Sequence, residues 1–187
     1  MSILVSLVPF AVFFALMRLV SPLAGLTGAL LASGLLCLRM WRRGESVKIL
    51  EVGSLVLFGL LVAYALLGAP RWTVATVRLA VDGGLLAIVL VSLAIGRPFT
   101  LAYARERVPE AFWALPVFHA TNRIISAVWG LAFAVLVAAD AAAEYLAVVP
   151  LWVDVGASVA AFLGAVWFTR WYPAVVRRRA LAAASPD

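Results

Sequence analysis

The sequence predicts an all-α, polytopic transmembrane helical bundle of about six membrane helices. Of its 187 residues, 66% are hydrophobic and only 13% are charged, and its mean hydropathy is +1.10. A soluble domain so rich in apolar residues would have to expose many of them to water. Apolar runs near the required length recur along the chain, since about 20 helical residues cross a hydrocarbon core of about 30 Å. No stretch alternates apolar and polar residues as the strands of a membrane barrel do.

Charges and turn residues divide the chain into six apolar segments within a single domain, residues 1–187. One helix over residues 3–38 would be about 54 Å long, too long for a bilayer, so Ser21 and Pro22 are expected to close a hairpin. The last two segments are separated at Asp140 and Glu144, whose carboxylates are costly in lipid; a broken final helix is the alternative. The helices are expected at about 3–17, 23–38, 49–69, 73–95, 124–139 and 145–168.

Basic residues predict the orientation of these segments. Twelve of the 15 lie in three polar stretches, at 39–48, 97–123 and 170–179. The positive-inside rule places all three stretches, and therefore both termini, in the cytoplasm. The formal net charge of +6 is then a consequence of topology, and nucleic acid is not an expected partner. We expect a multi-pass protein of the bacterial inner membrane with a basic cytoplasmic tail at 169–187.

The loop at 97–123, between the fourth and fifth helices, combines arginines with aromatic rings. Aromatic rings suit the boundary between acyl chains and headgroups, and guanidinium groups suit the phosphates of anionic lipids. We expect this amphipathic segment to lie along the cytoplasmic membrane surface as one or two short helices broken at Pro109. A surface for a cytoplasmic partner is the alternative. The expected anchoring residues are Arg97, Phe99, Tyr103, Arg105, Arg107, Phe112 and Trp113.

Four charged residues are predicted to lie at membrane depth. Arg78 and Asp82 are four residues apart, so they share a helix face and can pair. Asp154 lies within the last apolar segment, and Glu51 lies near the cytoplasmic start of the third. Charges at such depth are expensive, and the favoured interpretation is a neutralised Arg78–Asp82 pair that fixes the packing of helices. The alternative is a functional ion or proton path, here through Glu51 and Asp154.

Catalytic and cofactor-binding patterns are not found. A single cysteine, Cys37, and a single histidine, His119, cannot by themselves build a zinc or iron–sulfur site. The chain contains no Walker loop, nucleophile elbow or metal-binding histidine pair. We therefore expect no catalytic residues, no metal and no cofactor. A lipid-modifying enzyme that uses His119 with Thr121 or Ser126 is the least favoured alternative.

Several short motifs occur in a recognisable order. Pro9 precedes three phenylalanines in the first helix, "FG" stands at 58–59, "GRP" at 96–98 and "VPEAFW" at 108–113, followed by "TNRIISAVWGLAFAVL" from Thr121. In this order the chain resembles the intracellular septation protein A family of small bacterial inner-membrane proteins, over roughly residues 2–139. The segment after Trp72 departs from the family pattern, because it lacks a Lys-Pro pair and is followed by Arg78 and Asp82.

The resemblance implies a non-enzymatic role in cell envelope maintenance or septation, through contacts with other inner-membrane envelope or division proteins. It assigns no catalytic residues. The alternative is a small ion-coupled transporter or carrier that uses Arg78, Asp82 and Asp154 within the membrane.

Overall fold

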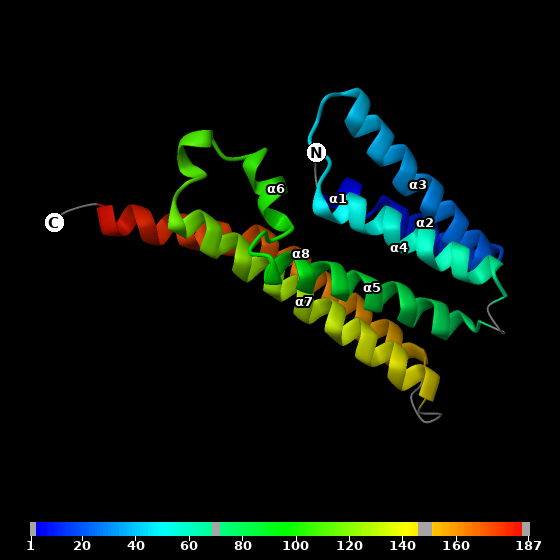
Figure 1. The fold of residues 1–187 in the computed structure, drawn as a ribbon. Coiled ribbons are helices and arrows are strands. Elements are labelled where there is room, and N and C mark those ends of the chain that lie inside the picture. The colour runs from blue at the N-terminus through cyan, green and yellow to red at the C-terminus, as the bar shows by residue number, and fades with distance from the viewer. Residues whose placement is uncertain (1–2, 69–71, 146–150, 185–187) are drawn as a thin grey trace.

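A computed structural model describes residues 3–68, 72–145 and 151–184, and the secondary structure of this part is entirely helical. Five of the described helices, α3, α4, α5, α7 and α8, are long and apolar enough to cross a membrane, and α2 is a shorter apolar helix. The predicted all-α membrane bundle is confirmed (Figure 1). The α-helices are α1 (Ile3–Ser6), α2 (Val8–Leu19), α3 (Pro22–Arg42), α4 (Ile49–Leu66), α5 (Val74–Ala94), α6 (Thr100–Arg105), α7 (Pro116–Tyr145) and α8 (Leu151–Ala184), with a 3-10 turn, η1, at Glu110–Phe112.

The predicted hairpin joins α2 and α3. The Ser21 hydroxyl accepts a hydrogen bond from the Ala24 N–H at 3.1 Å, and Pro22 takes the first helical position, where its missing N–H costs nothing. A Cβ atom on Gly25 would lie 2.8 Å from the Phe13 carbonyl oxygen. The two backbones therefore approach so closely that only glycine fits between them.

Most of the helices pack against their neighbours in the chain: α2 on α3, α3 on α4, α4 on α5 and α7 on α8, while α5 also packs on α7. Figure 1 shows α2–α4 on one side of the molecule and α5, α7 and α8 on the other. Gly84 of α5 receives the side chain of Leu57 of α4 where the two groups meet. Aromatic rings fill each group, with Phe10 against Phe58 in the first and Trp129 against Phe162 in the second.

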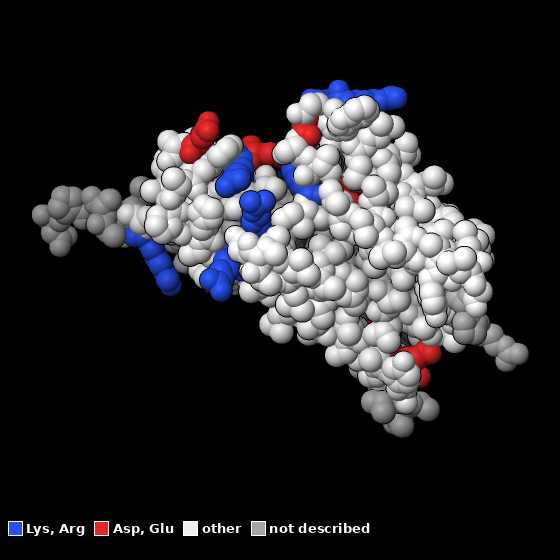
Figure 2. All heavy atoms as spheres, in the orientation of Figure 1, with Lys and Arg blue, Asp and Glu red and all other residues white. Residues whose placement is uncertain are grey.

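Charges gather at the two ends of the bundle. We call one end, where α3 and α5 finish and α4 and α7 begin, the basic end; it carries Arg42, Arg97 and Arg123. Figure 2 shows lysine and arginine side chains clustered there with acidic side chains among them, and acidic side chains without basic neighbours near the opposite end. At that opposite end Glu144 accepts hydrogen bonds from the hydroxyls of Thr73 and Thr76, at 3.0 and 2.9 Å.

Three predicted boundaries are wrong. The helix expected at 124–139 is α7, which already begins at Pro116, a residue favoured at a helix start, and the 97–123 loop is correspondingly shorter. The same helix continues through Asp140 and Glu144 to Tyr145, so these acids lie in a helix and not in a turn. The tail expected at 169–187 is helical as far as Ala184, because α8 continues through alanines and arginines that favour a helix. The predicted helix end at 69, the separation of the last two helices at 146–150 and the chain end at 185–187 lie outside the described residues.

Candidate functional site

Four charged side chains meet inside the second group of helices, and we call them the Arg78 cluster: Arg78, Asp82, Asp140 and Asp154. The guanidinium of Arg78 on α5 donates to the Asp154 carboxylate of α8, with Nη1 2.7 Å from Oδ2 and Nη2 3.2 Å from Oδ1. Nη2 also lies 2.6 Å from Oδ1 of Asp140 on α7, an ion pair without hydrogen-bond alignment. One arginine thereby links three helices.

The cluster is nearly closed to its surroundings. The side chain of Arg78 is 14% exposed, and those of Asp140 and Asp154 are 1% and 0% exposed. Asp82 is also buried, and its carboxyl interacts with that of Asp140. Such burial is tolerated because opposite charges compensate one another in a low dielectric. The site can therefore cross-link helices, and it can also hold a proton among its carboxyl groups.

The predicted pair between Arg78 and Asp82 is wrong. Their four-residue spacing does place them on the same face of α5, but the guanidinium reaches across to α7 and α8. Two separate carboxylates offer the arginine a better array of acceptors than one neighbour on its own helix. The sequence does not predict Asp140 as a site residue, because a lone carboxylate is costly within a membrane helix. The signal that could have found it is an arginine at membrane depth, which needs acidic partners on other helices.

A second polar cluster lies at the basic end, and we call it the Glu51 cluster: Ser6, Lys48, Glu51, Tyr103 and Glu106. The buried Glu51 carboxylate accepts hydrogen bonds from the Ser6 hydroxyl at 2.5 Å and from the Tyr103 hydroxyl at 3.0 Å. The Lys48 ammonium lies 4.5 Å from the centre of the Tyr103 ring and 2.8 Å from Oε1 of Glu106. These contacts fasten α6 to the first turn of α4 and to α1.

Two groups of this second cluster, Tyr103 and Glu106, have shifted pKa values. Burial, together with the Glu51 carboxylate, raises the pKa of the Tyr103 hydroxyl, so it remains a proton donor. Partial burial raises the pKa of Glu106, but the hydrogen bond and the charge of Lys48 outweigh it and hold that pKa below its ordinary value. The Glu106 carboxyl is therefore ionised at neutral pH.

Two predicted membrane anchors lie in the core. Phe99 and Tyr103 are 2% and 6% exposed, and the Phe99 ring packs edge-on against both Tyr103 and Trp129. The hydroxyl of Thr100 donates to the Asn122 carbonyl at 3.0 Å and also bonds with the Ser126 hydroxyl. The prediction that both rings face lipid is wrong, because α6 uses them to pack on the bundle.

The other predicted anchors lie closer to the surface. The Trp113 indole N–H donates to the Val108 carbonyl at 2.8 Å, and the Arg105 guanidinium lies 5.4 Å from the centre of its ring. Phe112 is half exposed in η1, and Arg97 and Arg107 are exposed. Their contact with headgroups stays a prediction.

The residues of the predicted polar path belong to separate clusters. Glu51 lies in the first turn of α4, at the basic end, whereas Asp154 lies in the first turn of α8, near the opposite end. Within the described residues, no three histidine, cysteine, aspartate or glutamate side chains are arranged to hold a metal ion. The chain matches no family model, no curated protein and no solved structure.

Proposed function

We propose that this chain is a non-enzymatic protein of the bacterial inner membrane, with both termini in the cytoplasm, that acts in envelope maintenance or septation through contacts with other membrane proteins. The order of its motifs, from Pro9 to the "VPEAFW" stretch at 108–113, supports this role by resemblance to the septation protein A family. The concentration of arginines at the basic end supports the orientation.

One observation carries the proposal, namely that the charges of the Arg78 cluster face one another in closed packing. A carrier needs its intramembrane charges along a water-filled cavity that its substrate can enter. Asp82, Asp140 and Asp154 are instead almost fully buried against α5, α7 and α8. Closed ion pairs between helices suit a protein whose task is to present a stable surface to partners.

A second candidate is a small proton-coupled carrier, and it is favoured by the charge count of the same cluster. One guanidinium faces three carboxyl groups, so full ionisation would leave surplus negative charge in a closed site. Such a charge is expensive in low dielectric, and the simplest compensation is a proton held among the aspartates. A carrier would bind and release that proton during its cycle.

Complementation of a deletion strain tests the first candidate and separates it from the second. The strain should lose envelope integrity, seen as raised permeability to a dye, lower osmotic tolerance or altered cell length, and the wild-type chain should restore it. Unchanged permeability, osmotic tolerance and division would overturn the proposal.

The matched variant is Asp82→Asn, which keeps the shape and hydrogen bonding of a protonated aspartate but cannot release a proton. A structural cluster accepts this change, so Asp82→Asn should complement fully at equal membrane abundance. If Asp82→Asn fails to complement at equal membrane abundance, the result favours the proton-coupled carrier.

A further inference from the structure

A hollow of about 470 Å³ opens at the basic end between the last turn of α5 and the first turns of α7. It exists because Gly96, at φ +69°, turns the chain away from α5 immediately after that helix ends. The Gly96 N–H bonds to the Leu93 carbonyl and the Arg97 N–H to the Ser92 carbonyl, which closes the helix end. The chain then leaves toward α6, and the space above α7 stays open.

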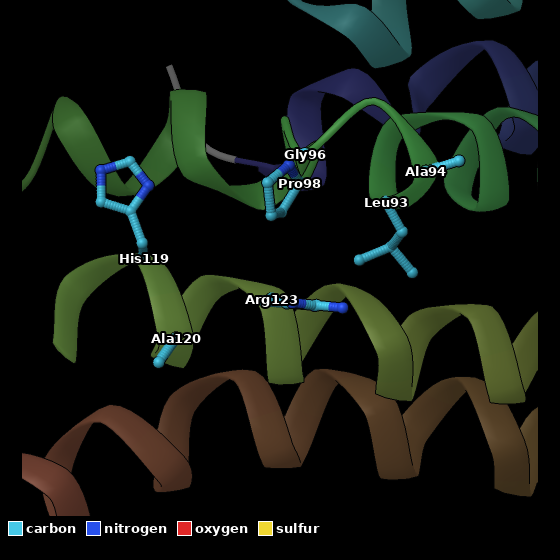
Figure 3. A pocket seen from close by; sticks show the side chains of 7 residues that line it. All are labelled: Leu93, Ala94, Gly96, Pro98, His119, Ala120 and Arg123. Atoms are coloured by element: carbon cyan, nitrogen blue, oxygen red, sulfur yellow. The ribbon is translucent and has the colours of Figure 1, made fainter. Parts of the chain in front are cut away.

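The lining of this hollow is apolar except on one side. Leu93, Pro98 and Ala120 contribute apolar surface, whereas His119 and Arg123 contribute nitrogen atoms. These two residues are four apart on α7 and so share a face. Figure 3 shows the His119 ring on the side of α7 that faces Pro98, and the Arg123 side chain in front of the α7 ribbon. Arg123 forms no ion pair or side-chain hydrogen bond with any residue that the structure describes, so its guanidinium is available to a ligand.

The depth of the hollow in the membrane indicates what kind of ligand it can bind. It lies where the apolar span α5 ends, which is the depth of the headgroups. Exposed apolar side chains share the faces of the lining residues on the same two helices, with Leu90 three residues before Leu93 on α5 and Leu131 eight residues after Arg123 on α7. A ligand that fits both parts has an anionic head and apolar chains, and basic pockets between membrane helices bind such headgroups.

We infer that this hollow binds the phosphate headgroup of an anionic phospholipid, such as phosphatidylglycerol, with the Arg123 guanidinium and the His119 imidazole donating to phosphate oxygens and the acyl chains lying along α5 and α7. Its volume falls in the usual range of about 300–1,000 Å³ for ligand sites, enough for a headgroup. The unpaired cation disfavours a zwitterionic lipid, whose choline group would bring a second positive charge.

Native mass spectrometry of the intact purified protein, titrated in detergent with phosphatidylglycerol or phosphatidylcholine, tests this site. We expect wild type to retain phosphatidylglycerol preferentially and Arg123→Gln to weaken that retention about tenfold, because a charge-assisted contact is lost. Arg43→Gln is the matched control, since Arg43 is also exposed at the basic end but directly follows α3, in the other group of helices. An equal loss in both variants would overturn the site in favour of general surface charge.

Two further experiments test the site without changing the charge of the protein. Ala120→Trp should block the hollow without removing a cation and reduce phosphatidylglycerol retention, whereas Ala111→Trp, at an exposed position in η1, should not. Retention by Ala120→Trp equal to wild type would overturn the proposal. Inorganic phosphate at the concentration of the lipid should displace little of it; complete displacement would identify a free-phosphate site and overturn the lipid assignment.

Discussion

At the scale of single residues, Arg78 has the largest structural consequences. Its guanidinium pairs with carboxylates from two other helices, and a third carboxyl lies beside them. Ion pairs of this kind are costly to bury and still more costly to break, because removing one partner leaves uncompensated charge. The arginine therefore decides whether α5, α7 and α8 can pack together.

We expect Arg78→Gln to lower the free energy of unfolding by about 3–5 kcal/mol, because three buried carboxyl groups lose their cation. Unfolding in detergent by increasing dodecyl sulfate, followed by circular dichroism, measures the change. Arg42→Gln is the control, because Arg42 is exposed at the end of α3 and should change stability by less than about 0.5 kcal/mol. Equal midpoints for both variants would show that the cluster does not hold the helices together.

At the scale of elements, α6 connects α4 to α7 through side-chain hydrogen bonds. Tyr103 reaches Glu51 on α4, while Thr100 reaches Asn122 and Ser126 on α7. The six residues of α6 are too few to form a stable helix alone. Its conformation therefore depends on these contacts. Arg105, the last residue of α6, and Arg107, two residues later, are both exposed.

We expect Tyr103→Phe to release α6, because the buried Glu51 carboxylate loses the Tyr103 hydroxyl as a donor, which costs about 1–3 kcal/mol. Trypsin cleavage at Arg105 and Arg107 in inside-out vesicles should become several-fold faster. Tyr64→Phe makes the same chemical change at an exposed position of α4 and should leave the rate unchanged. If cleavage is already fast in the wild-type chain, the segment is a free loop and α6 is not held to α4 and α7.

At the scale of the whole molecule, aromatic residues along α8 agree with a membrane-spanning position. Trp152 is exposed near its start, and Trp167 and Trp171 are exposed farther along it. They stand 15 to 19 residues apart, or about 22–28 Å, close to the hydrocarbon thickness of about 30 Å. Tryptophans at both boundaries form the aromatic belts of a membrane span, which leaves the arginine-rich end of α8 beyond the bilayer.

We expect the two ends of the bundle to be labelled from opposite sides of the membrane. In a Cys37→Ser background, Ser46→Cys should react with an impermeant maleimide in inside-out vesicles alone, because the positive-inside rule places the α3–α4 connection in the cytoplasm. Tyr145→Cys, at the exposed end of α7, should react on intact spheroplasts alone. Reaction of both positions from the same side would refute the even number of spans between the termini.

The sequence by itself determined the all-helical membrane architecture, the hairpin at Ser21 and Pro22 and the clustering of basic residues at one end. These features follow from local properties: the length of apolar runs, capping residues and the cost of charge in lipid. Periodicity also placed Arg78 and Asp82 on one helix face.

Only the tertiary structure decided which charges meet. Arg78 forms its ion pairs with Asp140 and Asp154 because α7 and α8 bring these two carboxylates next to the guanidinium. No local sequence pattern encodes the distance between side chains on different helices. For the same reason Phe99 and Tyr103, which suit a membrane surface by composition, became core residues once α6 packed on the bundle. Which side chains contact one another depends on distances between helices in the folded chain, and these distances cannot be obtained from composition or local sequence pattern.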